Sequence, residues 1–419
     1  MKERELIRKY KTPFYLYDEV ILAERTDCMR KALPGIGLCF ALKAAPILAG
    51  CLAGKVDRLE VCSPGEYEIC IRNGVSPDKL LVSGVNKSYE SINRILELGH
   101  GEGWYTIESP EHFEILDRCA READTVLNCY IRLSSGNQFG VDKDTLEELA
   151  FKVNESENLN LTGIHFFSGT QKTLKRIEGE LSELAEYGKS LRQKLKTEIG
   201  LEFGPGLGVN YFGAGEASGY EAEKADAEKQ LANLAEIVDR TGVNSVYRDV
   251  TFEYGRFIAA ASGRYFTGVA DIKKTYDVNY AILEGGIHQL TYYGSMAGMK
   301  IPYIMAVSAE EKSQSTAAGE KADGIAAENK ADGTETKEYV LAGSLCSVND
   351  ILVRKAVLPE LKKGDTLIFD LAGAYALTEG IGLFLSRDLP AVLIRDLNGE
   401  VRLVRDHMET NSINDGTGV

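Results

Sequence analysis

The chain has 419 residues, of which 44% are hydrophobic and 26% are charged, proportions typical of a globular protein with room for more than one domain. Its net charge of -15 at pH 7 argues against binding to nucleic acid or to an anionic membrane surface, since both are polyanions. The charged start, the lack of a membrane-length apolar run and eight scattered cysteines predict a cytoplasmic protein with free thiols and no metal site.

Before Ala259, short apolar strands alternate with longer segments whose apolar residues have helical spacing. Eight strands in this α/β pattern predict a (β/α)8 TIM-like barrel, with a doubly wound sheet as the competing arrangement. We assign residues 27–262 to the barrel. The expected strands are Gly37–Lys43, Arg58–Cys62, Lys79–Ser83, Trp104–Ile107, Val126–Leu133, Leu161–Phe167, Ile199–Phe203 and Arg248–Glu253.

Beyond Ala259 the chain changes to strand-like runs without long helices, such as RYFTGVADIKKTY, DTLIFDL and PAVLIRD. These runs predict a C-terminal all-β domain made of residues 263–419 together with residues 1–26, which contain the strand TPFYLYD. Within this domain, residues 308–338 contain almost no bulky apolar side chains. A segment of that composition cannot bury enough surface to order itself, so we predict a disordered insertion.

The segment FALKAA (40–45) delivers one lysine, Lys43, at the end of an apolar strand. Such a position hides the aliphatic stem and leaves the amine in a partly dry pocket, which favours a nucleophilic amine. Lys43 is therefore a candidate Schiff-base lysine. Taken alone, the segment also fits a lysine that caps a strand and extends its amine to water.

The ends of the seventh and eighth expected strands carry groups suited to an anion. The seventh strand runs into GPGLG (204–208), where backbone N–H groups can approach a phosphate, although many such loops are only turns. The eighth runs into EYGR, which places Glu253 near Arg256. An amine, a phosphate site and a carboxylate at one end of a barrel are what pyridoxal phosphate requires, with Glu253 holding the proton of the ring nitrogen. The alternative for Glu253 is a surface ion pair with Arg256.

Four further residues have both a functional and a packing interpretation. His165 and Phe167 share one face of the sixth strand, where either could lie against the cofactor ring or simply fill the core. Cys346 stands in a glycine-bounded turn and Tyr375 follows a Gly-Ala turn. They could act in the site, or be an inert thiol and an aromatic of the domain interface.

Together these motifs resemble the fold-type III pyridoxal-phosphate decarboxylases, a family that includes diaminopimelate, ornithine and arginine decarboxylases. The resemblance spans nearly the whole chain outside residues 308–338. The pattern GIHFFSGTQ is also similar to a branch acting in siderophore and antibiotic pathways, in some cases on amino acids linked to a carrier protein. The motifs that carry the resemblance are PFYLYD, FALKA, VCSPGEYE, LVSGVNKS, GPGLG, EYGR and the turns at Cys346 and Tyr375.

The resemblance implies an alanine-racemase-like barrel with a β domain, in a homodimer whose active sites each receive the cysteine turn of the neighbouring subunit. The enzyme would remove the α-carboxylate of an amino acid or amino-acid derivative, with pyridoxal 5'-phosphate bound as an aldimine to Lys43. Glu253 would pair with the pyridine nitrogen, and Cys346 would protonate the carbanion. The residues that would serve the phosphate are Gly206, Gly208, Arg256 and Tyr375.

Two departures from the family pattern concern the cofactor and the substrate. Phe167 stands where the family usually stacks a histidine on the cofactor. Diaminopimelate decarboxylases follow the cysteine with a glutamate and carry an Asn-Asp-x-x-Arg-Pro segment, whereas here Ser347 follows Cys346 and the matching residues 284–293 contain no arginine. We therefore expect a substrate with an uncharged or extended distal group. The residues expected to contact it are Ser347, His288, Tyr292 and Tyr293.

Three other functions compete with this one. Diaminopimelate decarboxylation in lysine biosynthesis uses the same machinery on a different substrate. A non-catalytic regulator related to the decarboxylases would be expected to lose the lysine or the glycine loop, and both are present. A cofactor-free Schiff-base aldolase would leave the Cys346 turn and the β domain without a role.

Overall fold

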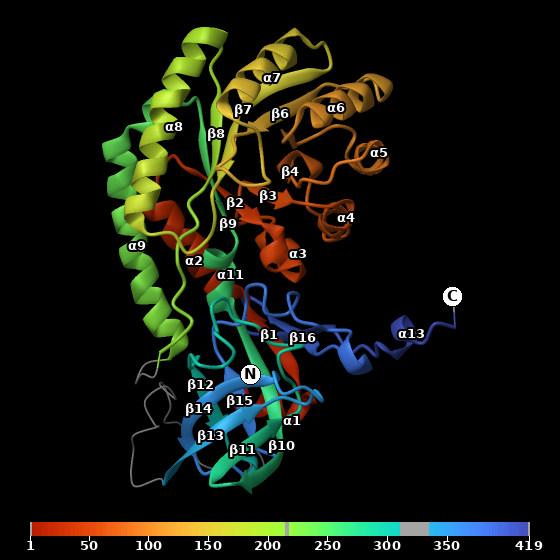
Figure 1. Cartoon of the computed structure of the whole chain (residues 1–419), viewed down its shortest axis with the longest axis vertical. Helices are drawn as coiled ribbons and strands as arrows, with labels where there is room; N and C mark the ends of the chain where they lie inside the picture. The colour runs from red at the N-terminus through yellow and green to blue at the C-terminus, as the bar shows by residue number, and fades with distance from the viewer. Residues whose placement is uncertain (1, 214–217, 311–334, 418–419) are drawn as a thin grey trace. The chain divides into compact units, whose positions relative to one another are not determined.

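The computed structural model describes residues 2–213, 218–310 and 335–417 (Figure 1). The chain divides into two compact units. The barrel unit comprises Ala23–Val209 and Ala227–Ile258, and the sheet unit comprises Met1–Leu22, Asn210–Asp226 and Ala259–Val419. Among the described residues, no helix has the length and apolarity needed to cross a membrane.

In the barrel unit, parallel strands close into a barrel in which β9 pairs with β2 (Figure 1). This confirms the predicted (β/α)8 barrel and excludes the doubly wound sheet, which would leave two open edges. The strands are β2 (Gly37–Ala41), β3 (Arg58–Val61), β4 (Leu80–Val82), β5 (Trp104–Ile107), β6 (Leu127–Arg132), β7 (Leu159–Phe167), β8 (Gly200–Gly204) and β9 (Val250–Tyr254).

The helices between the barrel strands lie around the outside of the barrel, with a further helix before the first barrel strand and another after the last (Figure 1). Several begin at a residue whose side chain accepts a hydrogen bond from a backbone N–H three positions on, as Ser63, Ser109 and Asp142 do. The helices are α2 (Glu19–Ala32), α3 (Ala49–Leu52), α4 (Pro64–Arg72), α5 (Tyr89–Gly99), α6 (Pro110–Glu122), α7 (Lys143–Glu155), α8 (Leu174–Leu195), α9 (Gly219–Thr241), α10 (Val243–Val246) and α11 (Arg256–Ala259).

The sheet unit is built on a nine-stranded sheet in which β1 lies between β10 and β16, which confirms an all-β second domain. The strands are β1 (Phe14–Asp18), β10 (Gly263–Thr275), β11 (Val278–Leu283), β12 (Ile304–Val307), β13 (Thr336–Ala342), β14 (Ile351–Pro359), β15 (Thr366–Phe369), β16 (Ala391–Arg395) and β17 (Val401–Arg405), with helices α1 (Glu3–Lys9) and α13 (Asn411–Asn414).

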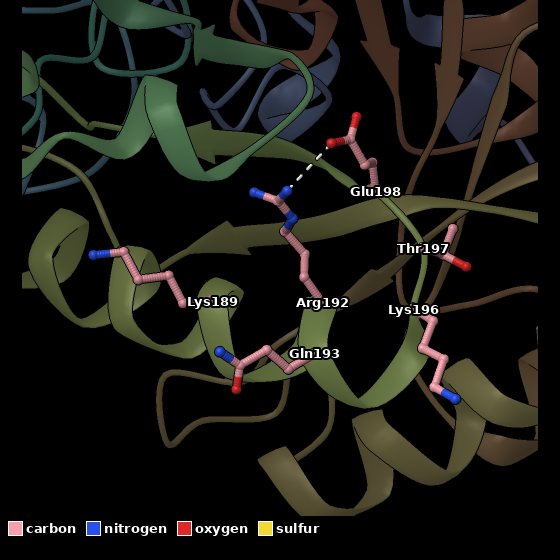
Figure 2. Close-up of a pocket in the computed structure, with 6 residues that line it drawn as sticks. All are labelled: Lys189, Arg192, Gln193, Lys196, Thr197 and Glu198. Carbon is pink, nitrogen blue, oxygen red and sulfur yellow. Dashed lines mark hydrogen bonds and ion pairs between the residues drawn. The ribbon is translucent and has the colours of Figure 1, made fainter.

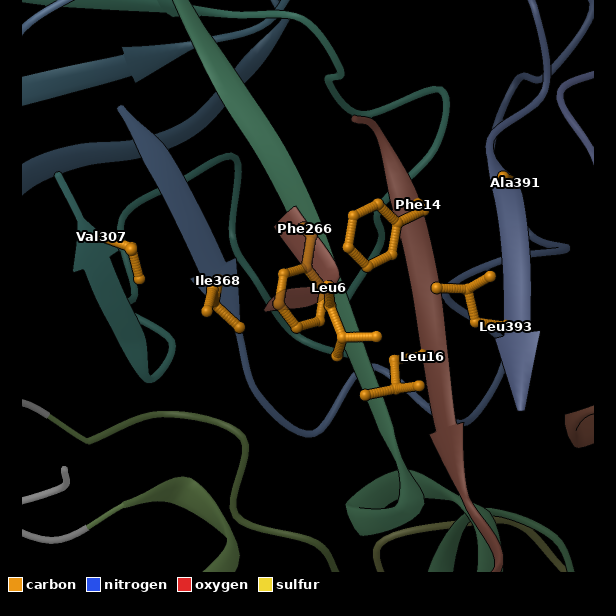
Figure 3. Close-up of a cluster of buried hydrophobic side chains, with 8 residues drawn as sticks. All are labelled: Leu6, Phe14, Leu16, Phe266, Val307, Ile368, Ala391 and Leu393. Carbon is orange, nitrogen blue, oxygen red and sulfur yellow. The ribbon is translucent and has the colours of Figure 1, made fainter. Parts of the chain in front are cut away.

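The core of the sheet unit gathers side chains from segments far apart in the sequence (Figure 3). The rings of Phe14 and Phe266 stack with centroids 4.5 Å apart, joining β1 to β10. The first strand is thus fixed in the sheet by side-chain packing as well as by its backbone pairing. The buried cluster consists of Leu6, Phe14, Leu16, Phe266, Val307, Ile368, Ala391 and Leu393.

Several predicted boundaries differ from the observed ones by one or more residues, and two of the differences bear on the site or on the sheet unit. The first barrel strand was expected to run to Lys43, but β2 ends at Ala41 and Leu42–Ala44 form a 3-10 turn. The disordered insertion was expected over residues 308–338, yet Thr336–Glu338 begin β13 and pair with β14. Polar residues can join a strand here because backbone pairing does not require apolar side chains. Residues 311–334 of the expected insertion lie outside the described residues.

At the start of the barrel strands a buried ion pair fills the interior. Arg58 Nη1 lies 2.6 Å from Glu202 Oε2 and also donates to the Tyr130 hydroxyl at 2.8 Å, while its guanidinium lies 3.9 Å from the centre of the Trp104 ring. Burial raises the pKa of Glu202 to about 7, outweighing the attraction of Arg58, which lowers it. The barrel therefore holds a carboxyl group that titrates near neutral pH.

This titration predicts a pH-dependent stability. The pKa of Glu202 in the folded protein is above the ordinary value of 4.5. The contribution of Glu202 to the unfolding free energy is therefore complete below pH 4.5 and is lost as the pH rises through about 7. Glu202→Gln removes the titration while keeping a hydrogen-bond acceptor for Arg58. Between pH 5 and 8 the wild type should lose about 2 kcal/mol more unfolding free energy than the variant. Urea unfolding at the two pH values measures the difference, and parallel profiles would contradict the assignment.

Candidate active site

Lys43 lies in the turn directly after β2, between two carboxylates. Its Nζ is 2.7 Å from Glu60 Oε2 and 3.9 Å from Glu253 Oε1. The Lys43 side chain is 38% exposed, whereas the neighbouring Leu42 and Ala44 are buried. Lys43 therefore lies in an apolar turn beside two buried acids, with its side chain partly open to solvent.

His165 on β7 fixes the second of these carboxylates. Its Nε2 is 3.0 Å from Glu253 Oε2, and both side chains are buried. Burial lowers the pKa of His165 to about 3, so the imidazole is neutral and donates through Nε2 to the carboxylate. Its Nδ1 has no hydrogen-bond partner among the described residues. The burial of Glu253 also excludes the surface ion pair considered for it.

The glycine loop after β8 packs against the end of β7. A Cβ on Gly204 would lie 2.4 Å from Cδ2 of Phe167, so this close approach of ring and backbone requires glycine. Gly206 has a φ of +59°, and a Cβ there would lie 2.3 Å from the Gly169 carbonyl oxygen. Phe167 and the loop therefore adjoin, as they would if one stacked on a cofactor ring and the other received its phosphate.

The two remaining phosphate candidates of the barrel unit differ in their surroundings. The Gly208 N–H donates to Gln230 Oε1 at 3.2 Å, so an anion at this residue would compete with the glutamine. Arg256 is buried and begins α11, two residues after β9 ends. The short segment Tyr254-Gly255-Arg256 thus brings a guanidinium to the same end of the barrel as Lys43.

Two residues beside Lys43 were missed from the sequence. Glu60, on β3, accepts from Lys43, and the Cys62 thiol donates to its other oxygen at 3.1 Å. Burial raises the pKa of the Cys62 thiol, which keeps it protonated and able to donate. Glu60 is the one acid in the otherwise apolar run Leu59–Val61, and that isolated charge is the signal that could have identified it.

A second lysine at the same end of the barrel has a different environment. Lys87 Nζ donates to the Gly84 carbonyl at 2.6 Å and lies 3.9 Å from Glu108, which also pairs with Arg132 at 3.2 Å. Burial lowers the pKa of Lys87 to about 8. Its side chain is only 2% exposed. Of these two lysines, Lys43 is the one that solvent can reach.

In the sheet unit, Asp350 organises the predicted cysteine turn. Its carboxylate accepts from the backbone N–H of Leu345 at 2.7 Å and of Ile287 at 2.9 Å. Cys346 is exposed, as expected for a residue in a turn, and Ser347 follows it. Asp350 thus holds the Cys346 turn beside the segment that carries His288.

His288 is an unusual buried histidine. It is 3% exposed, and neither ring nitrogen has a hydrogen-bond partner among the described residues. Burial lowers the pKa of His288, which leaves a neutral imidazole with two unused polar atoms. A buried polar group in this state is suited to contact a ligand.

The three predicted tyrosines of the sheet unit differ in their surroundings. The Tyr292 hydroxyl donates to the Asp370 carbonyl at 2.6 Å, so it already has an acceptor within the unit. Tyr375, five residues beyond Asp370, is half-buried and has a left-handed φ of +65°. Tyr293 is half exposed.

A surface cavity of about 380 Å³ lies elsewhere on the barrel unit (Figure 2). It is formed where α8 ends and the chain turns into β8, with an ion pair between Arg192 and Glu198 at 3.2 Å. Because β8 begins here and Lys43 follows the end of β2, the cavity and the lysine lie at opposite ends of the barrel. The lining residues are Lys189, Arg192, Gln193, Lys196, Thr197 and Glu198.

The C-terminal end of the barrel thus carries an amine beside two buried carboxylates, a neutral histidine and a glycine loop. The family described as "Pyridoxal-dependent decarboxylase, pyridoxal binding domain" matches residues 20–260, more than half of the chain. The chain belongs to this family. It is a pyridoxal-phosphate-dependent enzyme that decarboxylates an amino acid.

The chain is also similar to individual proteins along nearly its whole length. It is 23% identical to diaminopimelate decarboxylase from Aquifex aeolicus, covering 96% of this chain and 90% of that protein. It is 24% identical to L-glutamyl-[BtrI acyl-carrier protein] decarboxylase from Niallia circulans, covering 96% and 92%. The crystal structure of diaminopimelate decarboxylase from Helicobacter pylori complexed with L-lysine has the same fold, with a TM-score of 0.79, 22% identity and 98% of each chain covered.

Proposed function

We propose that Lys43 is the residue to which pyridoxal phosphate attaches. The observation that carries this proposal is the position of its amine, exposed to solvent yet 2.7 Å from Glu60 and 3.9 Å from Glu253. The carboxylate of Glu60 orients the amine and can accept a proton from it. The alternative lysine, Lys87, is sealed from solvent by its own partners.

The surrounding residues fit the other parts of the cofactor. When bound, pyridoxal phosphate supplies an electron sink for the pair left behind by departing carbon dioxide. Glu253 would keep a proton on the pyridine nitrogen, and the hydrogen bond from His165 fixes the orientation of that carboxylate. Phe167 would stack on the ring, and the loop from Gly204 to Gly208, with Arg256, would receive the phosphate.

Lys43→Ala should abolish the visible absorbance of the bound cofactor and almost all decarboxylation, because no other exposed lysine lies between the two acids. Lys87→Met is the matched control and should keep the absorbance. Reduction with borohydride followed by peptide mapping identifies the labelled lysine. A label on Lys87 or on any lysine other than Lys43 would overturn the assignment.

Cys346 is the proposed proton donor. Decarboxylation breaks the bond between the α-carbon and the carboxylate, leaves the electron pair on the α-carbon, and requires one proton there to give the amine. The exposed Cys346 thiol, in a turn fixed by Asp350, can supply it. We further propose a homodimer in which this turn completes the site of the neighbouring subunit.

The Cys346→Ala variant should slow turnover and divert part of the reaction to transamination, since protonation at the α-carbon becomes inefficient. Mixing Lys43→Ala chains, which should be inactive, with the impaired Cys346→Ala chains in equal amounts tests the shared site, because half of the dimers would regain one intact site. Random exchange should recover about a quarter of wild-type activity. Wild-type kinetics of Cys346→Ala would contradict the donor role, and no recovery on mixing would contradict shared sites.

The substrate we propose is an amino acid with an uncharged or extended distal group. An amino acid linked to a carrier protein is one such substrate. Its support is the neutral, buried His288, whose unused ring nitrogens suit a polar neutral group better than a charged one. Segment 284–293 also lacks an arginine to neutralise a distal carboxylate. Similarity to the carrier-protein decarboxylase favours this substrate, whereas similarity to the Aquifex diaminopimelate decarboxylase favours the rival.

The comparison that separates these substrates is kcat/KM for diaminopimelate, ornithine, lysine and a carrier-linked amino acid, with carbon dioxide release as the readout. Diaminopimelate should be a poor substrate because its distal charges would be buried without partners. His288→Phe should reduce kcat/KM for the preferred substrate and change that for diaminopimelate little. If diaminopimelate is preferred by more than about tenfold, or roughly 1.4 kcal/mol, the specificity assignment is wrong.

A further inference from the structure

Lys172 is a buried lysine next to the glycine loop, and it was not among the residues predicted to be functional. Its side chain is 1% exposed. The ammonium donates to Glu180 Oε2 at 2.6 Å, to Ser168 Oγ at 3.2 Å and to the Gly204 carbonyl at 2.8 Å. It therefore links helix α8 and the segment after β7 to the first residue of the glycine loop.

Backbone and side-chain bonds next to Lys172 join the same two segments. The Lys172 N–H donates to the Gly206 carbonyl at 2.9 Å. Gln171 makes a two-way contact with Val209, accepting from its N–H at 2.6 Å and donating to its carbonyl at 3.0 Å. The segment after β7 and the loop after β8 are thus held together at Gly204, Gly206 and Val209.

The Lys172 ammonium also approaches two aromatic rings. Its Nζ is 4.8 Å from the ring centre of Phe203 and 5.9 Å from that of Phe167, within the range of cation–π attraction. Phe167 is the aromatic residue that packs over Gly204. The same cation therefore contacts the loop backbone and the ring proposed to lie against the cofactor.

A purely stabilising role does not explain this choice of residue. Burying an ion pair costs desolvation energy, and well-packed apolar residues of similar volume are often equally stable or more so. What the ammonium adds is a set of directional hydrogen bonds, and one of them ends on the loop itself. Fixed loop geometry, rather than stability, is the advantage that a buried cation brings here.

We propose that Lys172 is a positioning residue that sets the shape of the Gly204–Gly208 loop for the cofactor's phosphate. Its ammonium acts through the Gly204 carbonyl and through Phe167, without touching the cofactor, while its backbone N–H separately donates to the Gly206 carbonyl. The inference rests on the proposed function of the loop. It predicts that loss of the ammonium weakens recognition of the phosphate specifically, not of the pyridoxal ring.

The test compares two ligands that differ only in the phosphate. Apo-protein is titrated with pyridoxal phosphate and with pyridoxal, and each Kd is measured by equilibrium dialysis. Lys172→Met keeps the apolar stem but removes the cation, and should weaken pyridoxal phosphate binding about tenfold, equal to about 1.4 kcal/mol, while pyridoxal changes less than about twofold. Lys194→Met is the control, since Lys194 is half exposed and pairs with Glu147 on the surface.

An unchanged ratio of the two dissociation constants in Lys172→Met would overturn the role of Lys172. Should that variant not fold, Glu180→Gln takes its place, because it removes the charge that pairs with the ammonium. It should likewise lower the ratio of the Kd for pyridoxal to the Kd for pyridoxal phosphate. A wild type that binds neither ligand would overturn the proposed function, and the role of Lys172 with it. If the wild type binds both ligands and the ratio is unaltered in the variant that folds, the role of Lys172 alone is overturned.

Discussion

The contact of the Lys43 amine with Glu60 and Glu253 is the interaction on which the candidate site depends. Two buried carboxylates so close together would repel each other, and the cation between them offsets that repulsion. Barrel closure brings them together, because β2 pairs with β3 on one side and with β9 on the other. The register sets Ala41 beside Glu60 and Cys39 beside Glu253. In an open sheet, β2 and β9 would be separated and the lysine would have one acid at most.

The sequence was sufficient to predict the barrel and the positions of Lys43, Glu253 and the glycine loop, because a reactive residue at the end of a parallel strand is recognisable from its strand alone. Pairing across strands could not be predicted in the same way. Glu60 lies on an apolar strand, and its importance appears only when β3 is placed next to β2. The end of β2 was also placed too late, since a 3-10 turn and an apolar strand have similar composition in FALKAA.

In the sheet unit, the contacts that hold two loops together could not be predicted from the sequence. Strand-like runs without long helices predicted the unit's β character, but no local pattern indicated that Asp350 would bind the backbone of both Leu345 and Ile287. A carboxylate that accepts from two distant N–H groups makes one rigid element of two loops. Gly286 and Gly343 permit this, because a Cβ on either would lie within about 2.5 Å of the Asp350 oxygens. The cysteine turn therefore owes its position to an aspartate four residues beyond Cys346 and to two glycines.

The Phe167 ring is held in place by its neighbours, one of which is the Lys172 ammonium. A phenyl ring offers a cofactor a stacking surface but, unlike an imidazole, it cannot be held in place by hydrogen bonds. Its orientation has to come from packing, and here it comes from contact with Gly204 on one side and from the nearby ammonium of Lys172. That ammonium is in turn fixed by Glu180 and Ser168. A histidine-to-phenylalanine change relative to the family pattern thus coincides with a buried cation that supports the ring, so the loop and the ring form one preorganised unit.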